Sequence, residues 1–397
     1  MTKLLNHINT YQSEADYQND KSKNFPNVSY IVENDNVLFV KEKTDYSNDY
    51  LTFEAIEDGT FTFTGTNSNS LSYSLDDGQT WTALASGSAS PTVTAGNKIM
   101  WKGTCTPSDN GSGKFSATAN FNVQGNIMSL LFGDDFTNQT NLTGKDYAFY
   151  FLFYQNTNIK SAKNLILPAT TLANACYSGM FYGCTSLTTA PELPATTLAN
   201  NCYEYMFRGC TSLVTAPTLP ATTLANACYS GMFWGCTSLV NAPVLPATTL
   251  ASNCYYGMFL GCTGLTTAPE LPATTLAEGC YQFMFYACTN LVNAPELPAT
   301  TLASSCYIGM FQDCTSLTTA PTLPATTLAD NCYQQMFYSC TNLNYIKCLA
   351  TDISANGCLS NWVYNVASTG TFVKNSAATW DVTGLNGIPD GWTVVTE

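Results

Sequence analysis

Pairs of cysteines eight positions apart recur along the chain, first in "CYSGMFYGC" at residues 176–184. Such thiols could hold a metal ion, form a disulfide, act as a catalytic nucleophile or serve as small apolar core residues. The same framing returns as "CYEYMFRGC", "CYSGMFWGC", "CYYGMFLGC", "CYQFMFYAC", "CYIGMFQDC" and "CYQQMFYSC". One explanation must therefore serve every copy.

Groups that could activate a thiol or a hydroxyl are scarce. The only histidine, His7, lies in a polar N-terminal stretch, so Cys–His and Ser–His–Asp catalysis have no credible base. The acidic pairs at 76–77 and 134–135 are interpreted as turn residues. We therefore expect a protein that is not an enzyme and has no catalytic residues, no cofactor and no metal site.

The composition narrows the choice of partners. Lys plus Arg number 14 against 28 for Asp plus Glu, a net charge of −14, which argues against nucleic acid and anionic membranes. The longest strongly apolar run, "YAFYFLFY" at 147–154, is far too short to span a bilayer. The stretch 1–20 lacks the apolar region of a secretory signal, so the sequence as it stands predicts a soluble chain made in the cytoplasm.

An internal repeat dominates the sequence. The block "LPATTLANACYSGMFYGCTSLTTAPE" starts at Leu167 and returns every 26 residues. A fixed period of this size predicts a solenoid, in which each unit buries its apolar face against its neighbours. The period is marked by Pro168, Pro194, Pro220, Pro246, Pro272, Pro298 and Pro324.

The differences between copies predict a helix in each repeat. On a wheel of about 100° per residue, the nearly invariant positions 172, 173, 176, 177, 180, 181 and 184 share one half and the variable positions the other. This pattern predicts an amphipathic α-helix at about 172–184 on the inner wall of each coil. The following "SLTTAPELP" is then the strand and turn, with pairing limited by its prolines.

The predicted helix decides between the uses of the cysteines. It separates Cys176 from Cys184 by about 12 Å, too far for a disulfide or a shared tetrahedral metal. Equivalent cysteines of neighbouring coils, about 4.8 Å apart, would lie side by side and point the same way. We expect ladders of reduced core thiols, with disulfides between some coils as the alternative; the odd total of 17 fits poorly with full oxidation.

The repeat motif also carries a family resemblance. The pattern "MFxGCTSLTTAPxLPATTLAxxCY" holds almost throughout residues 167–345 and resembles the 26-residue leucine-rich repeats of BspA-like bacterial surface proteins. The resemblance implies a right-handed strand-and-helix solenoid with a role in binding and adhesion, and it carries over no catalytic residues.

The flanking segments suggest four parts. We expect an N-terminal arm or hairpin anchor at 1–45, a β-sandwich at 46–127, the leucine-rich-repeat solenoid with its N-terminal cap at 128–358, and a C-terminal cap at 359–397. The predicted fold class is an α/β leucine-rich-repeat solenoid of seven 26-residue repeats plus divergent caps, preceded by an all-β sandwich and the arm.

Two smaller motifs precede the repeats. "SLDDGQTW", from Ser74 to Trp81, resembles the Asp-box of sialidases, but those enzymes need three arginines and this chain has one, so we interpret it as a hairpin whose Asp side chain caps the turn. The segment "VSYIVENDNVLFVKE" reads as an isolated hairpin, which is marginal in water and needs cover from the sandwich or another subunit. Its "PNVSY" start resembles N-terminal segments of gut Bacteroidetes phage virion proteins.

These observations favour a non-enzymatic binding protein displayed on a phage virion, as a fibre or decoration protein. The arm would dock to virion proteins or form a homo-oligomer, and the solenoid would contact polysaccharide or protein of the host surface. The protein would be made in the host cytoplasm and located on the virion surface. The alternative is a BspA-like adhesin on the bacterial cell surface.

The candidate ligand surface is the outward variable column, whose aromatic rings could stack on sugars or anchor a protein. The alternative is that these rings only pack on neighbouring coils, or that ligands bind a polar strand-side row formed by Thr189, Thr215, Asn241, Thr267, Asn293 and Thr319. The column runs through Leu260 and Gln312, and its candidate binding residues are Tyr182, Arg208, Trp234, Tyr286 and Tyr338.

Overall fold

The computed structural model divides the chain into two compact units, Met1–Tyr46 and Ser47–Glu397, which are described separately. Apart from Tyr46, side chains are described only in the second unit. The residues that the structure describes are 8–10, 28–33, 36–41, 46–65, 71–104 and 113–397.

The first unit contains a three-stranded antiparallel sheet in the order β1-β3-β2. Strands β2 (Val28–Glu33) and β3 (Asn36–Lys41) pair from Val28↔Lys41 to Glu33↔Asn36, which confirms the predicted hairpin. The short β1 (Ile8–Thr10) adds a strand that the sequence analysis did not anticipate. Docking of this segment to another protein stays a prediction.

The second unit begins with seven strands, β4 to β10, which lie within the predicted sandwich at 46–127. Together with β11 (Ile159–Ile166), they form a six-stranded sheet in the order β11-β10-β4-β8-β6-β7 and a separate β5–β9 pair. Their bounds are β4 Leu51–Ala55, β5 Phe61–Gly65, β6 Leu71–Ser74, β7 Thr82–Ala83, β8 Lys98–Gly103, β9 Gly113–Ala117 and β10 Phe121–Asn126.

The two sheets share an aromatic core. The ring of Phe53 on β4 lies 5.3 Å from Phe61 on β5 and 4.9 Å from Phe115 on β9, centroid to centroid. Trp101 on β8 lies 5.5 Å from Phe53 and is fully buried. Inward-facing residues that alternate along each strand therefore fill one core from both sheets.

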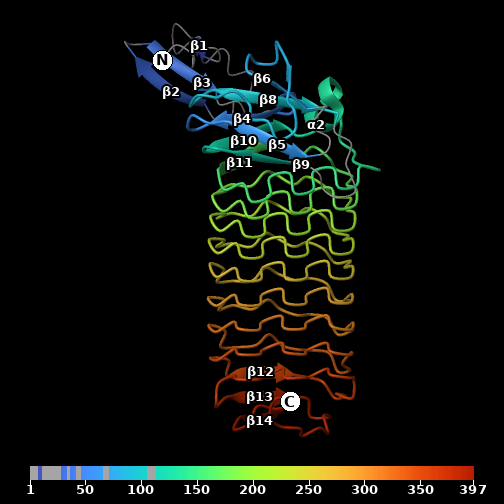
Figure 1. Ribbon diagram of the computed structural model, residues 1–397. Coiled ribbons are helices and arrows are strands. Elements are labelled where there is room, and N and C mark those ends of the chain that lie inside the picture. The colour runs from blue at the N-terminus through green and yellow to red at the C-terminus, as the bar shows by residue number, and fades with distance from the viewer. Residues whose placement is uncertain (1–7, 11–27, 34–35, 42–45, 66–70, 105–112) are drawn as a thin grey trace. The chain divides into compact units, whose positions relative to one another are not determined.

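The sandwich passes directly into the repeats. Strand β11 (Ile159–Ile166) pairs in parallel with β10, and its Ser161 forms a backbone bridge with Thr189 of the next coil. Phe153 lies 6.0 Å from Phe115 of the sandwich and 5.2 Å from Phe181 of the repeats. In Figure 1 the coils follow one another from β11 to the C-terminal strands, so sandwich and repeats have one continuous core.

The α-helix predicted at 172–184 is wrong. The amide of Cys176 donates to the carbonyl of Ala173, three residues back, and Ser178 donates to Ala175, whereas an α-helix would use the residue four back. Between these turns, the amide of Tyr177 donates 3.0 Å to the carbonyl of Cys202 in the next coil. Each repeat therefore contains a run of linked turns, here called the turn run, and the α/β class does not hold for the described repeats.

Backbone conformation explains why no helix can form. Ala175, Gly179 and Gly183 have φ values of 49°, 59° and 73°, in the left-handed region that a right-handed helix excludes. These three residues are the third residues of alternate turns in the run. The third residue is where a type II turn needs a positive φ. Asn201 and Tyr205 repeat the pattern one coil later, with φ of 57° and 54°.

The turn run reproduces the pattern that suggested a helix. Its residues alternate two in and two out, as in the next coil, where 202–203 and 206–207 are buried while 204–205 are partly exposed. This fourfold period corresponds to about 90° per residue, against about 100° for a helix. Across thirteen positions the two wheels differ too little to separate a half-buried helix from linked turns.

The predicted strand of each repeat is reduced to single backbone bridges. Thr189 bridges Thr215, which in turn bridges Asn241, and a second line of bridges includes Thr171↔Thr197. Prolines between the two lines of bridging residues remove amide donors, which keeps the pairing short.

The C-terminal end of the stack has three parallel strands, β12 (Tyr345–Cys348), β13 (Thr371–Lys374) and β14 (Thr393–Thr396). The strands β13 and β14 lie within the segment 359–397 that was predicted to be the C-terminal cap. A further turn run, with positive φ at Gly357, Asn361 and Asn365, lies across the predicted boundary at residue 358.

Indole groups fasten this end of the chain. Trp362 donates its ring N–H to the carbonyl of Gly387 at 2.8 Å, and Trp380 donates to Ala350 at 2.7 Å. A third indole, of Trp392, donates to the carbonyl of Ala367. These bonds hold the final segment against the exposed end of the core, as a solenoid cap requires.

Candidate ligand-binding surface

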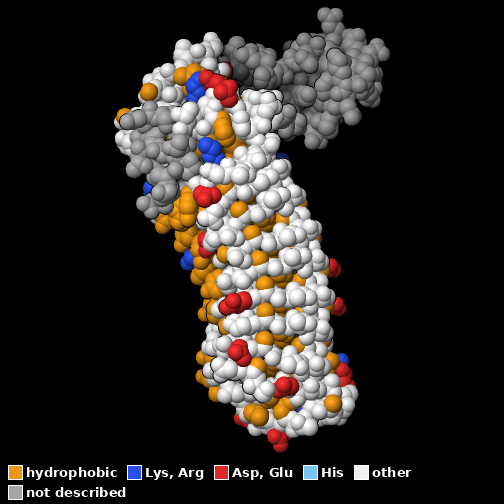
Figure 2. Space-filling view, turned by 90° about the vertical axis from the view of Figure 1, so that its right-hand side faces the viewer, with side chains coloured by type: hydrophobic (Ala, Val, Ile, Leu, Met, Phe, Trp, Pro, Cys, Tyr) orange, Lys and Arg blue, Asp and Glu red, His pale blue; other side chains and the backbone are white. Residues whose placement is uncertain are grey.

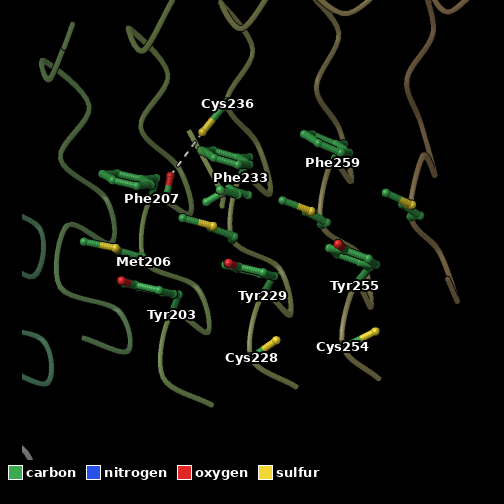
Figure 3. Close-up of a cluster of buried hydrophobic side chains, with 14 of the residues drawn as sticks. Tyr203, Met206, Phe207, Cys228, Tyr229, Phe233, Cys236, Cys254, Tyr255 and Phe259 are labelled. Carbon is green, nitrogen blue, oxygen red and sulfur yellow. Dashed lines mark hydrogen bonds between the residues drawn. The ribbon is translucent and has the colours of Figure 1, made fainter. Parts of the chain in front are cut away.

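Ladders of identical side chains fill the interior of the stack. Figure 3 shows one column of phenylalanine rings and one of tyrosine rings, each continuing from coil to coil. Phe233 lies 5.7 Å from Phe207 and 5.8 Å from Phe259, with the rings nearly parallel. These ladders fix which positions of a turn run point inward and which remain at the surface.

The cysteines belong to the interior. All 16 described cysteines are free and buried, which confirms the reduced core ladders, while Cys105 lies outside the described residues. Cys236 donates its S–H to the carbonyl of Phe207 at 3.1 Å, and the second cysteine of other copies does the same. Burial raises the pKa of the thiols, to about 12 for Cys176 and Cys236, so they stay protonated and unreactive at neutral pH.

The outward positions of the turn runs form the turn face. It comprises the positions equivalent to 174–175, 178–179 and 182–183 in each coil. The five candidate binding residues lie in the column equivalent to 182, and all are partly exposed. Their placement on the surface follows the prediction, although the wheel that produced it was helical.

Three of the five candidates come together. The guanidinium carbon of Arg208 lies 3.7 Å from the ring centroid of Trp234 and 5.2 Å from that of Tyr182. Tyr205, which the sequence analysis did not select, lies 5.2 Å from the same guanidinium and 6.4 Å from Trp234. We call Tyr182, Tyr205, Arg208 and Trp234 the Arg208 cluster.

The other two candidates lie in separate groups. Tyr286 neighbours Phe283 at 6.1 Å, and Tyr338 stacks on Tyr364 at 4.5 Å. Burial, followed by the charge and hydrogen bond of Asp313, raises the pKa of Tyr286. Leu260 separates Trp234 from Tyr286 in the column, and Gln312 separates Tyr286 from Tyr338.

Sequence reasoning missed three aromatic residues at left-handed positions that face a glycine of the next coil, namely Phe151, Tyr205 and Phe283. Each ring lies where a glycine in the next coil leaves room. A Cβ added to Gly179 would sit 1.9 Å from Phe151, and one added to Gly231 would sit 2.3 Å from Tyr205. The signal was present in the sequence, as an aromatic residue followed by glycine at the same repeat position.

The polar row on the strand side is a second surface. Thr215, Asn241, Thr267, Asn293 and Thr319 are exposed, and Thr189 is partly so. The amide of Asn293 donates to the hydroxyl of Thr267 at 3.3 Å. The row is neutral and nearly uniform, so it offers the same groups at every coil.

Shallow grooves open between the proline-rich segments of neighbouring coils. One groove of about 280 Å³ includes Val244, which is 79% exposed, and the prolines at 217, 220, 243 and 246. Another of about 470 Å³ contains Glu296 and the prolines at 295, 298, 321 and 324. From the sequence, these prolines were interpreted as marks of the repeat period and as breaks in pairing, not as the walls of grooves.

The Asp-box segment has the structural role predicted for it. Asp76 accepts hydrogen bonds from the hydroxyl of Ser74 at 2.8 Å and from the amide and hydroxyl of Thr80 at 2.9 and 2.6 Å. The bonds to Thr80, followed by that to Ser74, lower the pKa of Asp76 to about 2. The side chain therefore closes its own turn, which confirms the interpretation as a capped hairpin.

The surface has little positive charge. Figure 2 shows rows of hydrophobic side chains along the stack with scattered acidic ones and few basic ones. Among the residues that the structure describes, no helix is long and apolar enough to cross a membrane.

One family comparison identifies the repeats. The sequence model for the BspA type leucine rich repeat region matches in six copies, at residues 146–266 and 277–361, which together exceed half of the chain. The match extends beyond the regular blocks to include the aromatic run at 147–154. No curated protein and no solved structure matches the chain.

Proposed function

Because the chain belongs to the BspA-type leucine-rich repeat family, we propose that it is a non-enzymatic adhesion protein displayed on a surface. The proposal takes residues 167–345 as a solenoid of seven repeats whose turn face contacts a polymer of another surface. The family supports the adhesive role, and the regular hydrogen bonds between coils support the solenoid.

The observation that carries this proposal is the aromatic content of the turn face. Core packing requires large side chains at the inward positions, but it does not require Tyr182, Trp234 or Tyr338 at outward ones. Partly exposed aromatic rings are costly to leave in water and are typical of binding surfaces.

The thiols support a role without catalysis. They are intrinsically the strongest nucleophiles of the repeats, yet the 16 described ones are buried and burial raises their pKa. A buried, protonated thiol can neither reach nor attack a substrate.

Two matched variants test the turn face against the polar row. The first replaces Tyr182, Trp234, Tyr286 and Tyr338 with Ser, and the second replaces the Thr and Asn residues of the polar row with Ala. We expect only the first variant to lose binding to intact target cells, measured by flow cytometry with labelled protein. Loss only in the second variant would move the site to the strand side, and retention in both would refute ligand binding by either surface.

The family favours display on a bacterial cell surface. Display on a virion is the second candidate, supported by the separate three-stranded sheet in residues 1–46, which could dock to particle proteins. Light scattering of the full chain and of a chain beginning at Ser47 tests that arm. Self-association or particle binding only of the full chain would favour the virion, and identical behaviour of both chains would remove the arm from the proposal.

A further inference from the structure

Arg208 is isolated in a strongly acidic stretch of chain. Between Lys163 and Lys347 it is the only basic residue, whereas the same stretch contains seven acidic residues. At physiological salt, charges more than about 8 Å apart are largely screened, so a ligand at Arg208 responds mainly to its immediate surroundings. The local environment of this one guanidinium therefore decides what it can bind.

Aromatic rings lie around the guanidinium of Arg208. The 3.7 Å distance to the Trp234 centroid is that of direct stacking, and Tyr182 and Tyr205 lie farther out at 5.2 Å. Cation–π contacts of this kind fix the plane of an arginine without using its N–H groups.

The hydrogen-bond donors of Arg208 are left for a ligand. Within the described chain, no carboxylate lies within ion-pair distance of Arg208 and none of its side-chain N–H groups donates to another residue. The nearest acid in sequence, Glu204, accepts instead from the amide of Asn201 at 2.8 Å. A guanidinium that is held in one orientation and has free N–H groups can donate two parallel hydrogen bonds to one carboxylate.

We propose that the Arg208 cluster binds a carboxylate-bearing sugar of an acidic polysaccharide. The guanidinium would pair with the sugar carboxylate, while an exposed ring edge or face of Tyr182 or Trp234 would contact the C–H surface of the same or the adjoining sugar. This inference rests on the proposed adhesive function and specifies its ligand class. The combination of a fork and flanking rings favours a charged sugar over a flexible acidic peptide, which offers no flat apolar surface.

The cluster is built by its neighbours as well as by its own residues. A Cβ at Gly231 would lie 2.3 Å from Tyr205 Cε1 and 3.6 Å from Trp234 Cε3. The absence of a side chain at Gly231 therefore lets Tyr205 lie beside the stacked pair. Gln312 occupies the position equivalent to Arg208 four coils farther along the stack, and its side chain is uncharged.

The test measures binding of the full-length protein to polygalacturonate, neutral dextran, dextran sulfate and polyglutamate by isothermal titration calorimetry in 150 mM salt. We expect polygalacturonate to bind most tightly. Arg208→Lys, which keeps the charge but loses the fork, and Arg208→Gln should each weaken that binding at least about tenfold. Gln312→Ala is the matched control and should change nothing, and thermal unfolding verifies that each variant is folded.

Equal binding of dextran, or full binding by folded Arg208→Gln, would overturn the inference. Stronger binding of dextran sulfate would mean that the site prefers a sulfate to a carboxylate. Equal binding of polyglutamate would mean that the sugar is not recognised. Either result contradicts the proposal. If target cells bind through the turn face but polygalacturonate does not, this inference fails alone. If no cell binding depends on the turn face, the proposed function fails first.

Discussion

The interior and the turn face of the stack are built from the same turn runs but obey different rules. Phe233 is fully buried between two identical rings, whereas its neighbour Trp234 is partly exposed beside Arg208. Inside, one residue type recurs at each position because every coil packs on a copy of itself. Outside, composition changes from coil to coil, which leaves room for a specific site on a repetitive scaffold.

Alkaline pH should affect the interior most strongly. Burial raises the pKa of the core thiols to about 12 or beyond, while in the unfolded chain they ionise near 8.5. Their stabilisation is thus complete below about pH 8.5 and is lost as the pH rises toward the folded-state values. We therefore expect the free energy of unfolding to be lower at pH 10 than at pH 8.

Urea unfolding at pH 8 and pH 10 under reducing conditions measures this loss. Cys236→Ala provides the control, because removing one titrating thiol should reduce the pH dependence by one proton. A free energy of unfolding that is unchanged at pH 10 would contradict the buried thiol ladders.

The adjacent pair gives the sharpest comparison. Phe233→Ala removes a ring from the middle of a ladder and should cost about 3–5 kcal/mol. Trp234→Ala, one residue away, should cost under about 1 kcal/mol because its ring is partly solvated. Thermal and urea unfolding of both variants would separate the two surfaces, and equal losses would refute the assigned orientation of the turn run.

Two glycines distinguish backbone strain from packing at the turn face. Gly231 and Gly257 have φ of 56° and 54°, so alanine at either site should cost about 1–2 kcal/mol. Only Gly231 also supports a ring, since Leu260 atoms lie no nearer than 3.8 Å to a Cβ at Gly257. Gly231→Ala should therefore cost about 1–3 kcal/mol more; similar urea midpoints for the two variants would show that Tyr205 moves freely.

The smallest effect on the free energy of unfolding is expected at Leu260, a column position that belongs to no aromatic group. Leu260→Gln places at this coil the residue type found at position 312, and it should change the free energy of unfolding by less than about 0.5 kcal/mol. A larger loss in urea unfolding would mean that this outward position belongs energetically to the core.

The sequence predicted extended structure better than it predicted turns. Strands of the sandwich alternate polar and apolar residues with a period of two, which no other regular structure shares, and β4, β8 and β10 formed where this pattern lay. In the repeats, fourfold linked turns and a helix expose nearly the same residues. Gly179 and Gly183 were the distinguishing signal, because glycine recurring at every fourth position is unfavourable in a helix and suits positive φ.

The candidate surface was predictable only in part. Variability between copies correctly placed Tyr182, Arg208 and Trp234 at the surface, since outward positions are free of the ladder constraint. Their alignment in neighbouring coils followed from the 26-residue spacing, whereas the contribution of Tyr205, which fills the space above Gly231 in the next coil, was missed. Contacts between coils join positions 26 residues apart, so they are missed when each repeat is considered alone.

The interleaved hydrogen bonds of the turn run have a mechanical consequence. Amides at 175, 177, 179, 181 and 183 all donate to the next coil, so each interface is held by several bonds side by side. Under tension along the stack, the bonds within an interface share the load, while successive interfaces carry it one after another. Rupture should proceed coil by coil, each releasing about 90 Å of chain, and a tethered molecule of this kind would lengthen in steps before it detached.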